Sequence, residues 1–135
     1  MILVDTGFFL ALLDARDELH KRARAWAQCL QEQLLVTEYV LWETVNFASA
    51  PANRAKVHAL VGHVRSNAGY EIVGAGGALF EAGLRLHESR PDKEWSLTDC
   101  ISFLVMEARE IRRALAYDHH FEQAGFEALL RLDPP

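Results

Sequence analysis

The sequence has few cysteines. Cys29 and Cys100 are the only two among its 135 residues. They are too few for a disulfide framework and lack the paired spacing of a zinc site, so we expect both thiols to be reduced, with Cys100 in a helix core. This excludes the class of disulfide-rich small scaffolds.

Long hydrophobic runs are also missing. No apolar stretch approaches the roughly 20 residues that span a bilayer, and the first residues lack the basic region and long apolar segment of a secretion signal. We therefore expect a cytoplasmic protein with no membrane segment. No repeat or interdomain linker is visible, and a chain of 135 residues that is 50% hydrophobic suits one compact domain over residues 1–135.

Positive charge is in deficit as well. The formal net charge is -5, which argues against the nonspecific, charge-driven binding of nucleic acid by a basic domain. It does not exclude nucleic acid, because acidic side chains that hold divalent cations become a phosphate-binding surface.

What the sequence does contain is an alternation of short apolar strands and amphipathic helices. Strands are expected over residues 1–4, 34–36, 70–73, 114–117 and 129–132. Helices are expected over 8–13, 19–34, 38–48, 52–67 and 97–111, and a further helix after the glycine segment 74–77 runs through residue 87. An exposed loop is expected at 88–95 and a turn at 118–120. This alternation predicts an α/β fold with a mainly parallel sheet covered by helices on both faces.

Four carboxylates stand where such a sheet could gather them. Asp5 follows the first strand, Glu43 lies in the helix after the second, Asp99 begins the most apolar helix, and Asp118 follows the fourth strand. In open α/β sheets, ligands bind at the carboxyl ends of the strands. The four side chains therefore form a candidate site at one edge of the sheet.

Each acid also has a structural explanation. Asp5 could cap the next helix, and Glu43 could be an ordinary exposed helix acid. Asp99 follows Ser96 by three residues, the spacing of a capping box, and Asp118 could start a turn. Taken singly, each acid favours the structural interpretation, whereas four independent acids at the same edge favour a functional one.

Acids packed together repel and raise one another's pKa values, and a divalent cation relieves that repulsion. Oxygen donors without a matching histidine or cysteine set indicate a hard ion such as Mg²⁺ or Mn²⁺. Such an ion keeps open positions for phosphate oxygens and activates water. The chemistry expected of the site is phosphodiester hydrolysis.

Four motifs, in order and spanning nearly the whole chain, resemble those of the PIN-domain ribonucleases, and within them the VapC-like toxins of type II toxin–antitoxin modules. They are Asp5-Thr6 after an apolar strand, the segment 43–46 with an acid and Asn46 three residues on, the segment 96–100 around Asp99, and the long ending 116–126. One departure is Ala116, which stands where many relatives have a threonine or serine.

The resemblance implies a three-layer α/β/α sandwich around a sheet of four or five strands. It also implies Mg²⁺ or Mn²⁺ dependence, endonuclease attack on structured RNA such as tRNA or rRNA, a homodimer, and inhibition by a cognate antitoxin. Asp5, Glu43, Asp99 and Asp118 map onto the family's catalytic metal site. Thr6, Asn46 and Ser96 match supporting positions.

Two alternatives remain open. The first is a noncatalytic module with the same fold that holds a basic partner peptide in its acidic groove. The second, ranked last, is a response-regulator-like phosphotransfer domain, against which the strand at 70–73 ends in Gly74 without an aspartate. The glycine-rich segment 74–77 lacks the third glycine of a dinucleotide-binding fingerprint.

Overall fold

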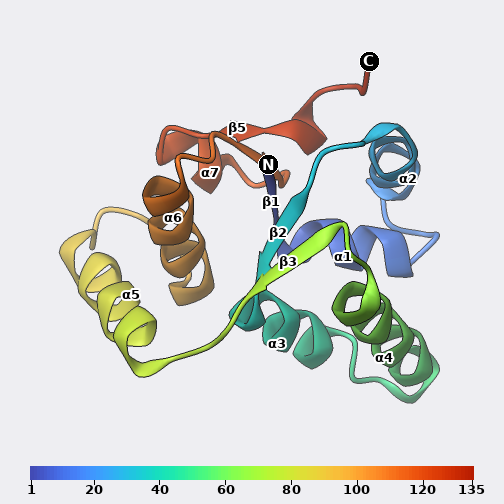
Figure 1. The fold of residues 1–135 in the computed structure, drawn as a ribbon, viewed down its shortest axis with the longest axis horizontal. Coiled ribbons are helices and arrows are strands. Elements are labelled where there is room, and N and C mark those ends of the chain that lie inside the picture. Colours follow the sequence, from blue (N-terminus) through green and yellow to red (C-terminus); the bar gives the residue numbers. More distant parts are fainter.

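The structure is a computed structural model of residues 1–135 (Figure 1). A five-stranded parallel sheet with the strand order β3-β2-β1-β4-β5 forms its centre. The strands are β1 (Ile2–Val4), β2 (Leu34–Thr37), β3 (Tyr70–Val73), β4 (Arg113–Leu115) and β5 (Glu127–Ala128). The helices are α1 (Thr6–Leu13), α2 (His20–Cys29), α3 (Glu38–Phe47), α4 (Pro51–Ser66), α5 (Gly77–Ser89), α6 (Leu97–Arg109) and α7 (His119–Gln123), followed by the 3-10 helix η1 (Leu129–Arg131).

The first strand lies in the middle of the sheet. Leu3 pairs with Leu35 of β2 on one side and with Ala114 of β4 on the other, both in parallel register. All three residues of β1 are fully buried, which explains why this strand is a continuous apolar run rather than an alternating one. The predicted mainly parallel sheet of four or five strands is confirmed.

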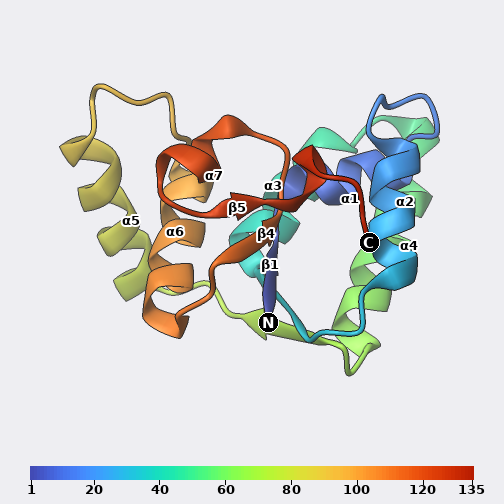
Figure 2. The same cartoon turned by 90° about the horizontal axis from the view of Figure 1, so that it is seen from above.

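Helices cover both faces of the sheet, as Figures 1 and 2 show. Ile2 and Val4 pack into a core with α1, α2, α3 and α4, whereas Leu3 points to a second core built mainly by α6 and α7. The alternation of β1 side chains between two cores is the packing of a three-layer α/β/α sandwich. The predicted architecture is therefore confirmed.

Several element boundaries differ from those predicted. Helix α2 ends at Cys29 instead of residue 34, because Leu30 is already extended. Residues 119–123 form the short helix α7, not a simple turn, and the last strand is β5 at 127–128, followed by η1 where a strand was expected. The other predicted helices are found within three residues of their expected ends.

The two cysteines do not form a disulfide. Cys29 is exposed, and Cys100 is buried in α6 as predicted. None of the helices is both long enough and apolar enough to cross a bilayer.

Candidate active site at the carboxyl edge of the sheet

All four acids line one pocket of about 490 Å³ at the carboxyl edge of the sheet. The elements that meet there are the end of β1, α3, the start of α6, and the loop after β4. The sixteen lining residues are Asp5, Thr6, Gly7, Leu10, Asp17, Leu19, Glu43, Phe47, Glu94, Ser96, Asp99, Tyr117, Asp118, His119, His120 and Arg131. Side chains separated by more than 110 residues in the sequence thus share one cavity.

Asp5 occupies the N-cap position of α1, but its side chain makes no capping hydrogen bond. The residue is only 8% exposed. Burial, and next to it the negative charge of Asp99, raise the pKa of Asp5 to about 8. The structural explanation of Asp5 as a helix cap is therefore insufficient, because its carboxylate faces the pocket and other acids.

Glu43 projects from the second turn of α3 and is half-buried. The hydroxyl of Thr6 donates a hydrogen bond of 2.6 Å to Glu43 Oε1. Because α1 begins at Thr6 directly after Asp5, this bond ties the Glu43 carboxylate to the turn that carries Asp5. Thr37, whose side chain caps α3 through the Val40 amide, fixes the start of the helix that presents Glu43.

Asp99 performs the structural role that its spacing predicted and lies in the pocket as well. The Asp99 amide donates to Ser96 Oγ at 3.0 Å, and the Ser96 amide donates to Asp99 Oδ2 at 3.1 Å, which completes a capping box. Burial raises the pKa of Asp99, against the opposing effect of the hydrogen bonds from Ser96 and His120. Ser96 also lines the pocket, so its two contacts orient a carboxylate of the site.

Asp118 is the N-cap of α7, where its side chain accepts a hydrogen bond from the His120 amide. The His120 ring lies between two of the acids, with Nδ1 3.2 Å from both Asp99 Oδ2 and Asp118 Oδ2. One ligand atom each from Asp118, His119 and His120 lies within 4.8 Å of the others. From the sequence, His119 and His120 adjoin the predicted site, either as turn residues or as a contact to phosphate. The structure places both at the start of α7, where they line the pocket.

Other residues of the pocket were also missed. Phe47, Tyr117 and Arg131 line it, although only Tyr117 falls within one of the four motifs, the ending 116–126. Among the predicted supporting residues, Thr6 and Ser96 line this pocket, whereas Asn46 is exposed and lines a neighbouring hollow that also reaches Glu43. The structure thus brings together the four predicted acids and two of the three supporting residues.

Oxygen donors dominate the site, and one Arg but no Lys lines the pocket. The pKa values of Asp5 and Asp99 are raised, and the pocket has too few basic side chains to neutralise four acids. This arrangement favours a bound cation. The donor set of four carboxylates, with imidazole nitrogens at the side, fits Mg²⁺ or Mn²⁺.

Comparison with known proteins identifies the family. Residues 2–127 match the family model described as the PIN domain. The chain is 34% identical over 128 residues to the 23S rRNA-specific endonuclease VapC20 of Mycobacterium tuberculosis, covering 93% of this chain and 95% of that protein.

Solved structures agree with the family assignment. The crystal structure of Mycobacterium tuberculosis VapC20, a Sarcin-Ricin loop cleaving toxin, superposes with a TM-score of 0.87 and 25% identity, covering 99% of this chain and all of that one. FitAcB from Neisseria gonorrhoeae shares the fold, with a TM-score of 0.68, 17% identity and coverage of 95% and 96%. The chain therefore belongs to the PIN-domain family.

Proposed function

We propose that this chain is a metal-dependent endoribonuclease that hydrolyses phosphodiester bonds of structured RNA and acts as the toxin of a toxin–antitoxin pair. One observation carries the proposal: carboxylates from four separate segments line a single pocket, and the pKa values of two of them are raised by burial. The similarity to a 23S rRNA-specific endonuclease supports ribosomal RNA as the first substrate to test.

The metal proposed for this site is Mg²⁺ or Mn²⁺, held by Asp5, Glu43, Asp99 and Asp118. When bound, such an ion supplies Lewis-acid chemistry that activates water and stabilises charge on phosphate oxygens. The carboxylates of this chain hold the ion and counter its charge. The burial of Asp5 and Asp99 strengthens that interaction, because fewer waters compete with these two side chains, whereas Asp118 is exposed.

The neighbouring residues position these carboxylates. Thr6 restricts the rotation of Glu43 through its 2.6 Å hydrogen bond, and Ser96 fixes Asp99 through the capping box. With its proton on Nδ1, His120 donates to the carboxylate of Asp99 or to that of Asp118, each of which lies 3.2 Å away. Preorganisation of this kind lowers the cost of orienting groups when the substrate arrives.

The proposed partners follow from the same chemistry. A cognate antitoxin that inserts an Arg or Lys among the acids would replace the charge of the metal with that of a side chain. A toxin–antitoxin complex from Klebsiella pneumoniae shares the fold, with a TM-score of 0.58 and 14% identity over 84% of this chain. We also propose that the chain forms a homodimer and works in the cytoplasm.

The test is incubation of the purified protein with ribosomal RNA and with tRNA in the presence of Mn²⁺ or Mg²⁺. We expect cleavage at defined sites, its loss in EDTA, and its loss in the Asp5→Asn variant. Glu81→Gln is the matched control, because Glu81 is an exposed acid of α5 outside the pocket. Absence of cleavage by a folded, metal-loaded protein would reject the proposal.

The noncatalytic binding module remains the second candidate, since an acidic pocket also suits a basic peptide. Calorimetry separates the two. Binding of Mn²⁺ that is lost in Asp99→Asn supports the nuclease, whereas no divalent-metal binding together with no cleavage supports the module.

A further inference from the structure

The pocket that holds the acids also contains exposed aromatic rings. Three aromatic side chains of the whole structure are strongly exposed: Trp42 at 66%, Phe47 at 70% and Tyr117 at 45%. Phe47 and Tyr117 line the acidic pocket, whereas Trp42 lines the neighbouring hollow. An exposed aromatic ring contributes little to the core, so its place beside the acids needs another explanation.

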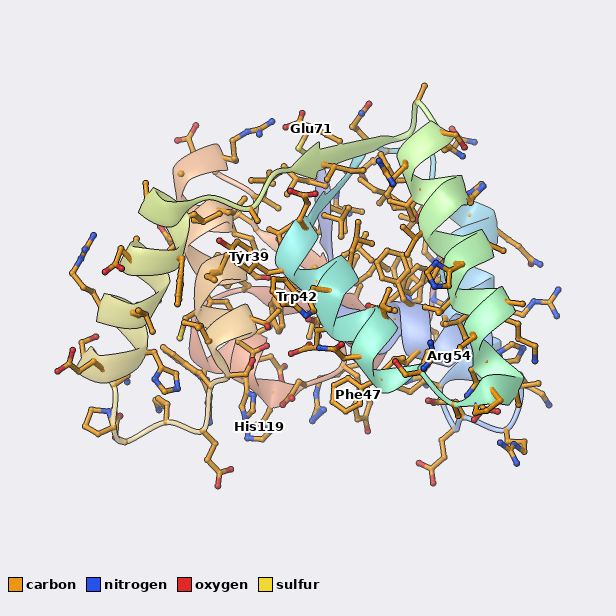
Figure 3. The ribbon with its side chains drawn as sticks, turned by 90° about the horizontal axis from the view of Figure 1, so that it is seen from below. Tyr39, Trp42, Phe47, Arg54, Glu71 and His119 are labelled. Atoms are coloured by element: carbon orange, nitrogen blue, oxygen red, sulfur yellow. The ribbon has the colours of Figure 1, made fainter.

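The two rings that line the acidic pocket, Phe47 and Tyr117, each lie close in sequence to one of the acids. Phe47 follows Glu43 by four residues on α3, which places both side chains on the same face of that helix. Tyr117 directly precedes Asp118 in the loop after β4. Figure 3 shows Phe47 at the end of α3 on the side of His119, while Glu71 lies at the opposite edge of the sheet.

Arg131 holds the second ring in place. Its guanidinium lies 4.7 Å from the centroid of the Tyr117 ring, and its Nη1 donates a hydrogen bond of 3.0 Å to the Tyr117 carbonyl. The Arg131 Nε also pairs with Glu122 at 3.1 Å. One side of the ring is therefore backed by a planar cation, while nearly half of the residue stays open to solvent.

We propose that Phe47 and Tyr117 are binding residues on which unpaired nucleobases of the RNA substrate stack, next to the carboxylates that act on the phosphate. This inference rests on the proposed endoribonuclease function and narrows its substrate to RNA whose bases are unstacked at the cut, such as a loop or bulge.

The chemistry of the pocket selects this ligand. Its carboxylates repel the phosphate backbone unless a cation is bound, so charge alone attracts RNA poorly to a chain of net charge -5. Stacking on an aromatic face needs no charge and accepts every base. A base in an intact duplex cannot use such a face, because its neighbours already cover it.

The experiment uses an RNA octanucleotide carrying one 2-aminopurine, whose fluorescence is quenched by stacking. It is bound to the full-length Asp5→Asn protein, in which cutting is expected to be absent. We expect Phe47→Ala and Tyr117→Ala each to weaken binding by about 5- to 150-fold and to reduce the quenching. Phe47→Trp and Tyr117→Phe keep a ring and should retain both signals.

Trp42→Ala is the matched control, because Trp42 is an equally exposed aromatic residue of the same helix outside the acidic pocket. Made in the Asp5→Asn protein, it should leave the affinity for the octanucleotide and the quenching of 2-aminopurine fluorescence unchanged. When the same octanucleotide is annealed into a duplex, Phe47→Ala should change its binding affinity much less.

Two results would overturn the inference. Unchanged affinity and quenching in both alanine variants would show that no base stacks there. A shift of Phe47→Ala to a smaller oligomer, with quenching intact, would assign the ring to a contact between copies of this chain. Failure of the proposed function looks different, since the protein with all four acids would then cut no RNA, whatever residue stands at 47 or 117.

Discussion

At the scale of single residues, the helix caps of the pocket do not all behave alike. Asp99 and Asp118 use their side chains to accept backbone hydrogen bonds, so their capping roles and their places in the pocket are compatible. Asp5 stands at a cap position without such a bond. It should therefore destabilise the metal-free protein whenever it is ionised.

The pH dependence of stability tests this point. The pKa of Asp5 is raised from its ordinary value of 3.8 to about 8 by burial and by Asp99, so the folded protein keeps a proton that the unfolded chain has lost. We compare the free energy of unfolding of the metal-free wild type with that of Asp5→Asn. The contribution of protonated Asp5 is fully present below about pH 4 and is lost as the pH rises toward 8. A shift of this size corresponds to a difference of about 5 kcal/mol near pH 8.

Urea unfolding in EDTA at several pH values between 4 and 8 measures this difference. Glu81→Gln should follow the wild type across the range. Parallel curves for Asp5→Asn and the wild type would contradict the burial of an ionisable carboxylate.

Thr6 allows a second test at this scale. Thr6→Val keeps the shape of the side chain but removes the donor to Glu43 Oε1. We expect the rate of RNA cleavage to fall about 10- to 100-fold, because Glu43 loses its fixed orientation. Thr6→Ser, which retains the hydroxyl, should keep most of the rate, and equal rates in all three proteins would show that Thr6 does not position Glu43.

The sequence predicted a hydroxyl beside the acids at Thr6, but not its partner. Thr6 and Glu43 are 37 residues apart, so only the packing of α1 on α3 reveals their contact. Arg131 was missed for the same reason, since its contact with Tyr117 joins residues 14 apart. Phe47 and Tyr117 were not predicted as site residues, because an exposed ring has no sequence signal of its own.

At the scale of elements, the sequence was most informative where local chemistry alone fixes the backbone. The spacing of Ser96 and Asp99 predicted a helix start, and the capping box is present. Helix α7 was missed because five residues give too little periodicity to separate a helix from a turn. The αL conformation of Glu110, a non-glycine residue, ends α6 two residues before the predicted end.

The contact between α5 and α6 depends on a glycine. A Cβ added at Gly83 would lie 2.5 Å from Ile101 Cγ1, which is closer than two non-bonded carbon atoms can approach. Gly83→Ala should therefore lower the free energy of unfolding by about 1–3 kcal/mol, despite the higher helix propensity of alanine.

Gly62 in α4 is the matched control, because a Cβ there meets no atom within 4 Å. Gly62→Ala should raise the free energy of unfolding by about 0.5–1 kcal/mol. Denaturant unfolding measures both variants, and a stabilising Gly83→Ala would mean that α5 can move away from α6 at little cost.

At the scale of the whole molecule, alternating strands and helices were sufficient to predict the sheet and its helical layers. The convergence of the acids also followed, because parallel strands bring their carboxyl ends to one edge. The roles of these acids as metal ligands stay a prediction.

Metal binding should therefore stabilise the whole fold. Adding Mn²⁺ at about 100 times its dissociation constant should raise the free energy of unfolding by about 2.7 kcal/mol, and EDTA should reverse the gain. Asp99→Asn and Asp118→Asn should lose most of this response in a thermal-shift titration. A full response in both variants would place the ion elsewhere.

The position of β1 has a consequence for synthesis on the ribosome. Among the five strands β1 is made first, yet it lies between β2 and β4, and β4 follows about a hundred residues later. Asp118 follows β4, so a nascent chain that ends before it carries at most three of the four acids. Translation itself thus delays the assembly of the pocket until the segment after β4 has been made.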